Sequence, residues 1–67
     1  METYRINVGN NKIKRFVKLD DYQYPDFVSI EDIVSVSQKN GFSIIYLADG
    51  NTVNTKMDAE EFLKALA

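Results

Sequence analysis

Apolar and polar positions alternate most clearly between Phe27 and Thr55, where short apolar runs are separated by two tight turns. The turns are Lys39-Asn40-Gly41 and Ala48-Asp49-Gly50, and such glycine turns between apolar runs are the strongest short-range signal for β-hairpins. The run Ile44–Leu47 does not alternate, which predicts a central strand covered on both faces. The pattern therefore predicts a three-stranded antiparallel meander with strands at Ile33–Gln38, Phe42–Leu47 and Thr52–Lys56.

The register of the second hairpin follows from the turn type. A type I turn with Gly50 in the left-handed bulge position places Ile45 opposite Val53, and this is the register we expect. A two-residue turn would instead place Val53 opposite Tyr46. The Asn40-Gly41 turn leaves the same ambiguity open, and a slip of one residue there would exchange the faces of a whole strand.

The first third of the chain predicts a second hairpin. Tyr4, Ile6 and Val8 alternate with polar residues, and Gly9-Asn10-Asn11 supplies turn residues before a strand at Ile13–Leu19. A polar, tyrosine-rich loop follows from Asp20 to Asp26. Ser29 then looks like the cap of a helical turn that leads into the next strand.

After Met57 the apolar spacing becomes helical, with Phe62, Leu63 and Leu66 as the apolar stripe. Asp58, with Glu61 three residues later, is a capping-box variant, and the helix is too short to persist without docking. The predicted fold is one small α+β, β-rich domain over residues 1–67: about five antiparallel strands in a strongly bent sheet or small open barrel, with one short C-terminal helix. The expected core is Tyr4, Ile6, Val17, Leu19, Ile33, Val36, Ile44, Ile45, Leu47, Val53, Phe62 and Leu66.

The amino-acid composition excludes several kinds of catalytic and metal-binding site. The 67 residues include no cysteine and no histidine, so thiolate chemistry and the commonest general base are absent. The chain has no histidine that could activate a serine as a nucleophile. The carboxylates within each of the pairs Asp20-Asp21 and Glu31-Asp32 point in different directions in either a strand or a helix. We therefore expect no enzyme activity, no cofactor and no metal site. The absence of a leader or a long apolar run predicts a cytoplasmic protein without a membrane partner.

The net charge of −2 is unevenly distributed. Residues 1–18 carry five basic residues against one glutamate, a net of +4, whereas residues 19–67 carry three lysines against nine carboxylates, a net of −6. Lys12, Lys14, Phe16 and Lys18 are two residues apart and share one face of a regular strand, while Arg15 points to the other face. A lysine row with an aromatic ring suits a nucleic-acid backbone, although the pI near 4.9 argues against a dedicated nucleic-acid binder. The alternative is a solvated strand whose lysines discourage edge-to-edge pairing.

The tyrosine-rich loop is the second candidate surface. Tyr22, Tyr24 and Phe27 offer large aromatic contact area, which is enriched at protein interfaces. The alternative is that Tyr22 or Tyr24 folds back as a lid over a small core. We treat Tyr22, Tyr24 and Phe27 as the candidate protein-binding residues.

The order of residues from Phe27 onward resembles two families. Val28–Val36, then Ile44–Leu47 and Asp49-Gly50, is similar to the small flagellar FlbD/SwrD-type proteins and to the strand–turn–strand part of LytTR-type DNA-binding domains. The resemblance covers about 40 residues and implies a β-rich fold. The flagellar type lacks a Tyr22–Tyr24 loop, and the LytTR type reads DNA through a basic, histidine-containing segment that has no counterpart here. No functional residue carries over from either family.

These observations predict a non-catalytic protein-interaction module, such as a small bacterial regulator or a phage or mobile-element accessory protein. Its partner would be another protein, or a second copy joined through an edge strand. The alternative is nucleic-acid binding through Lys12, Lys14, Arg15, Phe16 and Lys18. A second alternative is a small ligand bound at a subunit interface.

Overall fold

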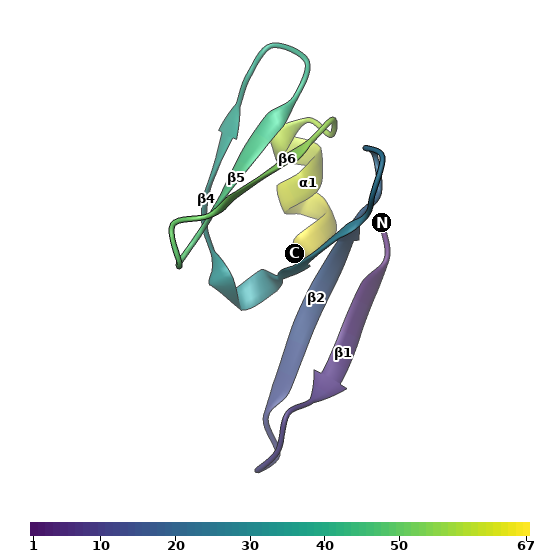
Figure 1. The fold of residues 1–67 in the computed structure, drawn as a ribbon, viewed down its shortest axis with the longest axis vertical. Helices are drawn as coiled ribbons and strands as arrows, with labels where there is room; N and C mark the ends of the chain where they lie inside the picture. The colour runs from purple at the N-terminus through teal and green to yellow at the C-terminus, as the bar shows by residue number, and fades with distance from the viewer.

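The computed structural model describes all 67 residues, which form six strands and a short C-terminal helix. The expected single bent sheet or barrel of five strands is wrong: the strands form two separate three-stranded antiparallel sheets, in the orders β1-β2-β3 and β4-β5-β6. Figure 1 shows β1 and most of β2 extending away from the second sheet and from α1. The elements are β1 (Thr3–Asn7), β2 (Ile13–Leu19), β3 (Asp26–Ser29), the 3-10 turn η1 (Ile30–Asp32), β4 (Ile33–Gln38), β5 (Ser43–Leu47), β6 (Thr52–Thr55) and α1 (Ala59–Leu66).

The sheet β4-β5-β6 is the predicted meander, and β5 is its central strand. Ile45 pairs with Val53, and the Leu47 amide donates to the Asn51 carbonyl at 2.9 Å, so the predicted bulged register is confirmed. Gly50 has a φ of 90°, the left-handed conformation that this turn requires. At the other turn Gln38 pairs with Ser43 and the Lys39 amide donates to the Phe42 carbonyl at 2.7 Å, which leaves two central residues, Asn40 and Gly41.

Strand β4 contains an irregularity that the pattern of residues did not predict. Ile33 pairs with Leu47 while Ser35 pairs with Tyr46, so Val34 is an extra residue without a partner on β5. A regular strand places residues three apart on opposite faces. The bulge at Val34 therefore lets Ile33 and Val36 both contact the core, and Val34 itself lies in solvent.

The core lies where β2 and β3 meet the second sheet and α1. Its fully buried apolar members are Val17, Leu19, Val28, Ile45 and Phe62. Four residues were assigned to apolar packing wrongly. Tyr4 and Ile6 lie on a projecting hairpin, and Leu63 faces solvent on α1. Ile44 lies on the opposite face of β5 from Ile45 and does not pack against the buried cluster. The alternation in β1 is real, but no other element covers that strand.

The segment before the second sheet was only partly predicted. The helical turn exists as η1, but Ser29 does not cap it with its side chain; its hydroxyl is buried without a hydrogen-bond partner. Ser29 instead ends β3, the strand that the pattern of residues missed. At α1 the Asp58 cap is confirmed, because its carboxylate accepts from the Glu60 amide at 2.9 Å. No helix has the length and apolar character needed to cross a membrane.

Candidate protein-interaction surface

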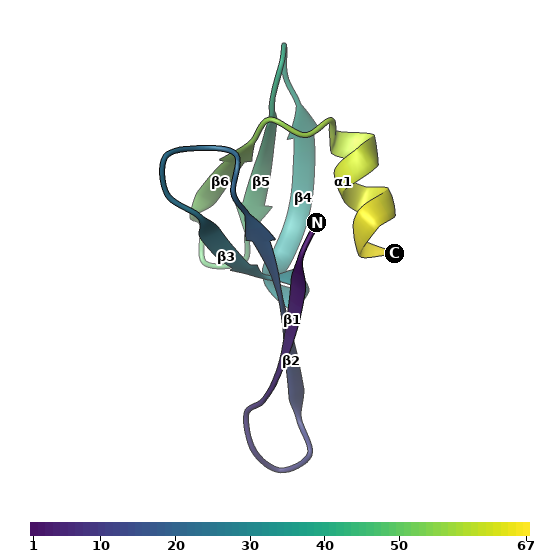
Figure 2. The ribbon, with the colours of Figure 1, turned by 90° about the vertical axis from the view of Figure 1, so that its right-hand side faces the viewer.

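The β1–β2 hairpin projects beyond the rest of the molecule, as Figure 2 shows from the side. The molecule measures 42 × 23 × 21 Å, and every residue of β1 is exposed. At the tip, the Lys12 amide donates a hydrogen bond to the Gly9 carbonyl at 2.9 Å. The three turn residues Gly9, Asn10 and Asn11 all have positive φ. Residues that tolerate this conformation give the hairpin a defined tip.

One face of the first sheet carries exposed apolar side chains, and we call it the outer face. The register pairs Tyr4 with Phe16 and Ile6 with Lys14, so these four side chains lie on one face. Phe27 joins them from β3: its ring meets Tyr4 edge to face, with 5.9 Å between centroids. Tyr4, Ile6 and Phe27 are 40%, 48% and 55% exposed. The outer face is therefore an ordered apolar patch in contact with solvent.

The basic strand is only partly as predicted. Lys14, Phe16 and Lys18 share the outer face on β2, whereas Lys12 lies in the turn before the strand begins. The ammonium group of Lys14 lies 5.6 Å from the centre of the Phe16 ring. Lys18 is paired with Asp20 at 3.5 Å. The strand is thus not a continuous row of free lysines.

The opposite, inner face of the hairpin carries two arginines. Arg5 and Arg15 are directly paired across β1 and β2, a position where like charges repel. Arg15 is neutralised by Glu31, with 3.3 Å between guanidinium and carboxylate, while Arg5 forms no ion pair. A cleft of about 320 Å³ lies beside them, and it is also lined by Ile30 and Leu66.

The tyrosine-rich loop is tied to the second sheet at its first residues. The Asp21 carboxylate accepts from the Thr55 hydroxyl at 2.5 Å and from the Lys56 amide at 2.8 Å. The Lys56 ammonium in turn lies 5.1 Å from the centre of the Tyr22 ring. Tyr24 is 74% exposed, so it is not a lid over the core. Tyr22 and Tyr24 therefore lie on an anchored loop, while Phe27 belongs to the outer face.

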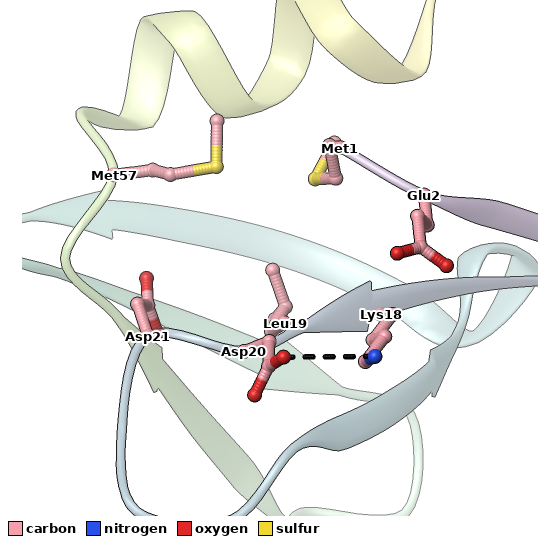
Figure 3. A pocket seen from close by; sticks show the side chains of 7 residues that line it. All are labelled: Met1, Glu2, Lys18, Leu19, Asp20, Asp21 and Met57. Atoms are coloured by element: carbon pink, nitrogen blue, oxygen red, sulfur yellow. Dashed lines mark ion pairs between the residues drawn. The ribbon is translucent and has the colours of Figure 1, made fainter.

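A second hollow, of about 390 Å³, lies between the start of the chain, the end of β2 and the segment before α1. Figure 3 shows Met57 and Met1 across this space, with Lys18 directed to Asp20. Glu2, Asp20 and Asp21 also line it, yet no three acidic side chains of the protein gather as a metal site would require.

Glu2 and Tyr4 each shift the pKa of the other. The Tyr4 hydroxyl donates to the Glu2 carboxylate, and this hydrogen bond lowers the pKa of Glu2, with a further contribution from Lys18. The same bond raises the pKa of Tyr4 above its ordinary value. Both groups are in solvent, so the effect is local.

The contact between the rings of Tyr4 and Phe27 is the feature that the sequence did not predict. In the structure Phe27 faces solvent and Val28 faces the core, but both are apolar, so the sequence shows no alternation here, and four residues after a proline-containing loop were too few to identify a strand. With β3 recognised, the pairing of Phe27 with Lys18 would have placed its ring on the outer face.

Comparison of the chain with protein-family models, with curated proteins and with solved structures found no match. The resemblance to the FlbD/SwrD-type and LytTR-type proteins therefore stays a prediction.

Proposed function

We propose that this chain is a non-catalytic protein-interaction module whose contact surface is the outer face of the sheet β1-β2-β3. The observation that supports it is the exposure of Tyr4, Ile6 and Phe27 together on one ordered face. Isolated exposed apolar residues are normal on a small protein, but a contiguous group on a projecting element is typical of a binding site. Such a module would belong to a small bacterial regulator or to an accessory protein of a phage or mobile element.

Aromatic residues and a polar rim match the composition of protein interfaces. Phe27 and Tyr4 form the apolar centre of the outer face, and Lys14 and Lys18 lie at its sides. Interface centres are enriched in aromatic residues and depleted in free charges, with polar groups around them. Tyr22 and Tyr24 would extend the contact from the neighbouring loop.

The proposal is tested by capturing partners with the immobilised protein from cells that produce it, before and after the outer face is altered. The variant Ile6→Ser with Phe27→Ser removes two exposed apolar side chains and should leave the fold intact, because neither residue is in the core. We expect the specifically captured proteins to be lost.

The matched control is Val34→Ser with Leu63→Ser, which removes two exposed apolar side chains elsewhere, 65% and 51% exposed against 48% and 55% for Ile6 and Phe27. Capture should survive in the control. If both double variants captured the same proteins as the unaltered chain, the outer face would not be the contact surface. A third variant, Tyr22→Ala with Tyr24→Ala, decides whether the loop takes part.

Nucleic-acid binding is the second candidate, because Lys14, Phe16 and Lys18 lie on the same face as Tyr4 and Phe27. Bases stack on exposed rings while lysines contact phosphates. Titration of labelled oligothymidylate at low salt tests it: binding should weaken steeply as salt rises and disappear in Lys14→Glu with Lys18→Glu. If neither oligothymidylate nor a duplex oligonucleotide bound at low salt, this function would be excluded for the outer face.

A further inference from the structure

Strand β1 leaves one row of main-chain groups without partners. It has a neighbour on one side only, β2. The Lys18 amide donates to the Glu2 carbonyl, and the Val8 amide donates to the Lys12 carbonyl, each at 3.0 Å. Because bonded and non-bonded pairs alternate in an antiparallel ladder, the even-numbered residues of β1 face β2. The amides and carbonyls of Thr3, Arg5 and Asn7 therefore face the open edge.

The two faces beside this edge differ in chemistry. On the outer face, the edge is bordered by Tyr4 and Ile6, followed by Val8 just beyond the strand. On the inner face, the edge is bordered by Arg5, and Arg15 lies next to Arg5 on the neighbouring strand β2. A strand added at this edge would alternate its side chains between the two faces. It would need apolar side chains on the Tyr4 side and acidic ones on the Arg5 side.

Charge favours an acidic strand. Arg5, Lys12 and Lys14 form no ion pair, and all three belong to the hairpin. Glu31 pairs with Arg15, whereas Arg5, which lines the same 320 Å³ cleft, has no acidic side chain as a partner. A carboxylate on an added strand, directly opposite Arg5, would give this guanidinium the partner that it lacks.

The same charges disfavour a second copy at this edge. Pairing β1 with β1 of another copy would place two hairpins of like charge side by side, each with Arg5, Lys12 and Lys14 unpaired. Basic residues on an edge strand are a known obstacle to such pairing. The observations thus fit a partner of opposite charge better than self-association.

We propose that the open edge of β1 binds an extended acidic segment of a partner protein as an additional strand. Its acidic side chains lie on the Arg5 side, and its apolar side chains on the Tyr4 and Ile6 side. This inference rests on the proposed function and specifies its partner. Strand addition of this kind draws affinity from main-chain hydrogen bonds and specificity from alternate side chains.

The test uses labelled peptides of alternating glutamate and valine, titrated against the full chain by fluorescence anisotropy at low salt. Two N-methylated versions carry the methyl groups on alternate residues, either on the amides that face β1 or on those that face away. We expect the plain peptide to bind, and also the version methylated on the amides that face away from β1. The version methylated on the amides that face β1 should not bind, because it has lost the donors of the added strand. Hydrogen exchange by NMR should show the amides of Arg5 and Asn7 becoming protected when the plain peptide binds.

The variant Arg5→Glu replaces an attraction with a repulsion on the inner face. We expect it to weaken binding of the glutamate–valine peptide about tenfold, since an exposed ion pair is lost and a like-charge pair is gained. Lys39→Glu makes the same change of charge in the β4–β5 turn and should leave binding within about twofold of the unaltered protein. Circular dichroism checks that both variants fold.

Several results would overturn the inference. Equal binding of both methylated peptides would show that no strand is added, and equal binding of a lysine–valine peptide would show no acidic preference. Protection of Arg5 and Asn7 without peptide, in a dimer seen by light scattering, would mean that a second copy occupies the edge. Binding of oligothymidylate in place of every peptide would assign the hairpin to nucleic acid. If the peptides fail while Ile6→Ser with Phe27→Ser still abolishes partner capture, the proposed function stands and only this inference falls.

Discussion

The two three-stranded sheets are built from similar alternating sequences but have different surroundings. In β4-β5-β6, the row Val36, Ile45 and Val53 faces the core, and α1 and the first sheet cover it. In β1-β2-β3, only the end of β2 and β3 reach the core, and β1 is exposed throughout. The difference teaches that alternation reports which residues share a face, whereas burial depends on whether another element covers that face.

The same substitution placed in each sheet tests this comparison most strongly. Ile45 is 0% exposed, so Ile45→Ala should cost about 2–5 kcal/mol in free energy of unfolding, from lost transfer energy and a cavity. Ile6 is half in solvent, so Ile6→Ala should cost less than about 1 kcal/mol. Urea unfolding followed by circular dichroism measures both. Equal losses would mean that the hairpin is covered in solution.

The second prediction concerns the tie between the two sheets. Asp21 accepts hydrogen bonds from Thr55 and Lys56, and Thr55 is fully buried. Asp21→Ala should cost about 1.5–3 kcal/mol, the usual contribution of a hydrogen bond to a charged group. Asp26→Ala is the control, because Asp26 is exposed and its carboxylate forms no hydrogen bond in the structure. A loss no greater than that of the control would show that the loop is not held by Asp21.

The smallest expected effect is on titration at the outer face. Tyr4 should lose its proton above the ordinary tyrosine pKa of 10.0, because its hydroxyl donates to the Glu2 carboxylate. Glu2→Gln should bring the pKa of Tyr4 back toward that value, as followed by NMR of labelled tyrosine rings. The contribution of this hydrogen bond to stability is complete between pH 4.5 and pH 10.0, the ordinary pKa values of the two groups, and is lost as pH rises through the raised pKa of Tyr4. At the acid end it is lost as pH falls through the lowered pKa of Glu2.

Local turn chemistry was predictable because it depends on few residues. Asp49-Gly50 determined the bulged turn, and with it the pairing of Ile45 with Val53. Asp58 likewise determined the start of α1. These features are decided by backbone conformations and hydrogen bonds within four residues, which the amino-acid types restrict directly.

The arrangement of the two sheets was not predictable in the same way. Tyr4 and Ile6 have the pattern of a core strand, and only the path of the chain after Leu19 shows that nothing packs on them. Of the candidate site, the exposure of Tyr22 and Tyr24 was predicted as one of two alternatives, and Phe27 was predicted as a binding residue without its partner Tyr4. The contact between Tyr4 and Phe27 depends on residues 23 positions apart, brought together through β2.

The extra residue in β4 has a consequence for how this chain can change in length. A deletion inside a strand normally turns every following side chain to the wrong face. Here Ile33 and Ser35 already pair with neighbouring residues, Leu47 and Tyr46, on either side of Val34. A descendant that lacked Val34 would keep Ile33 opposite Leu47 and Val36 opposite Ile45. β4 is thus a strand in which evolution can remove a codon without shifting the pairing of the sheet.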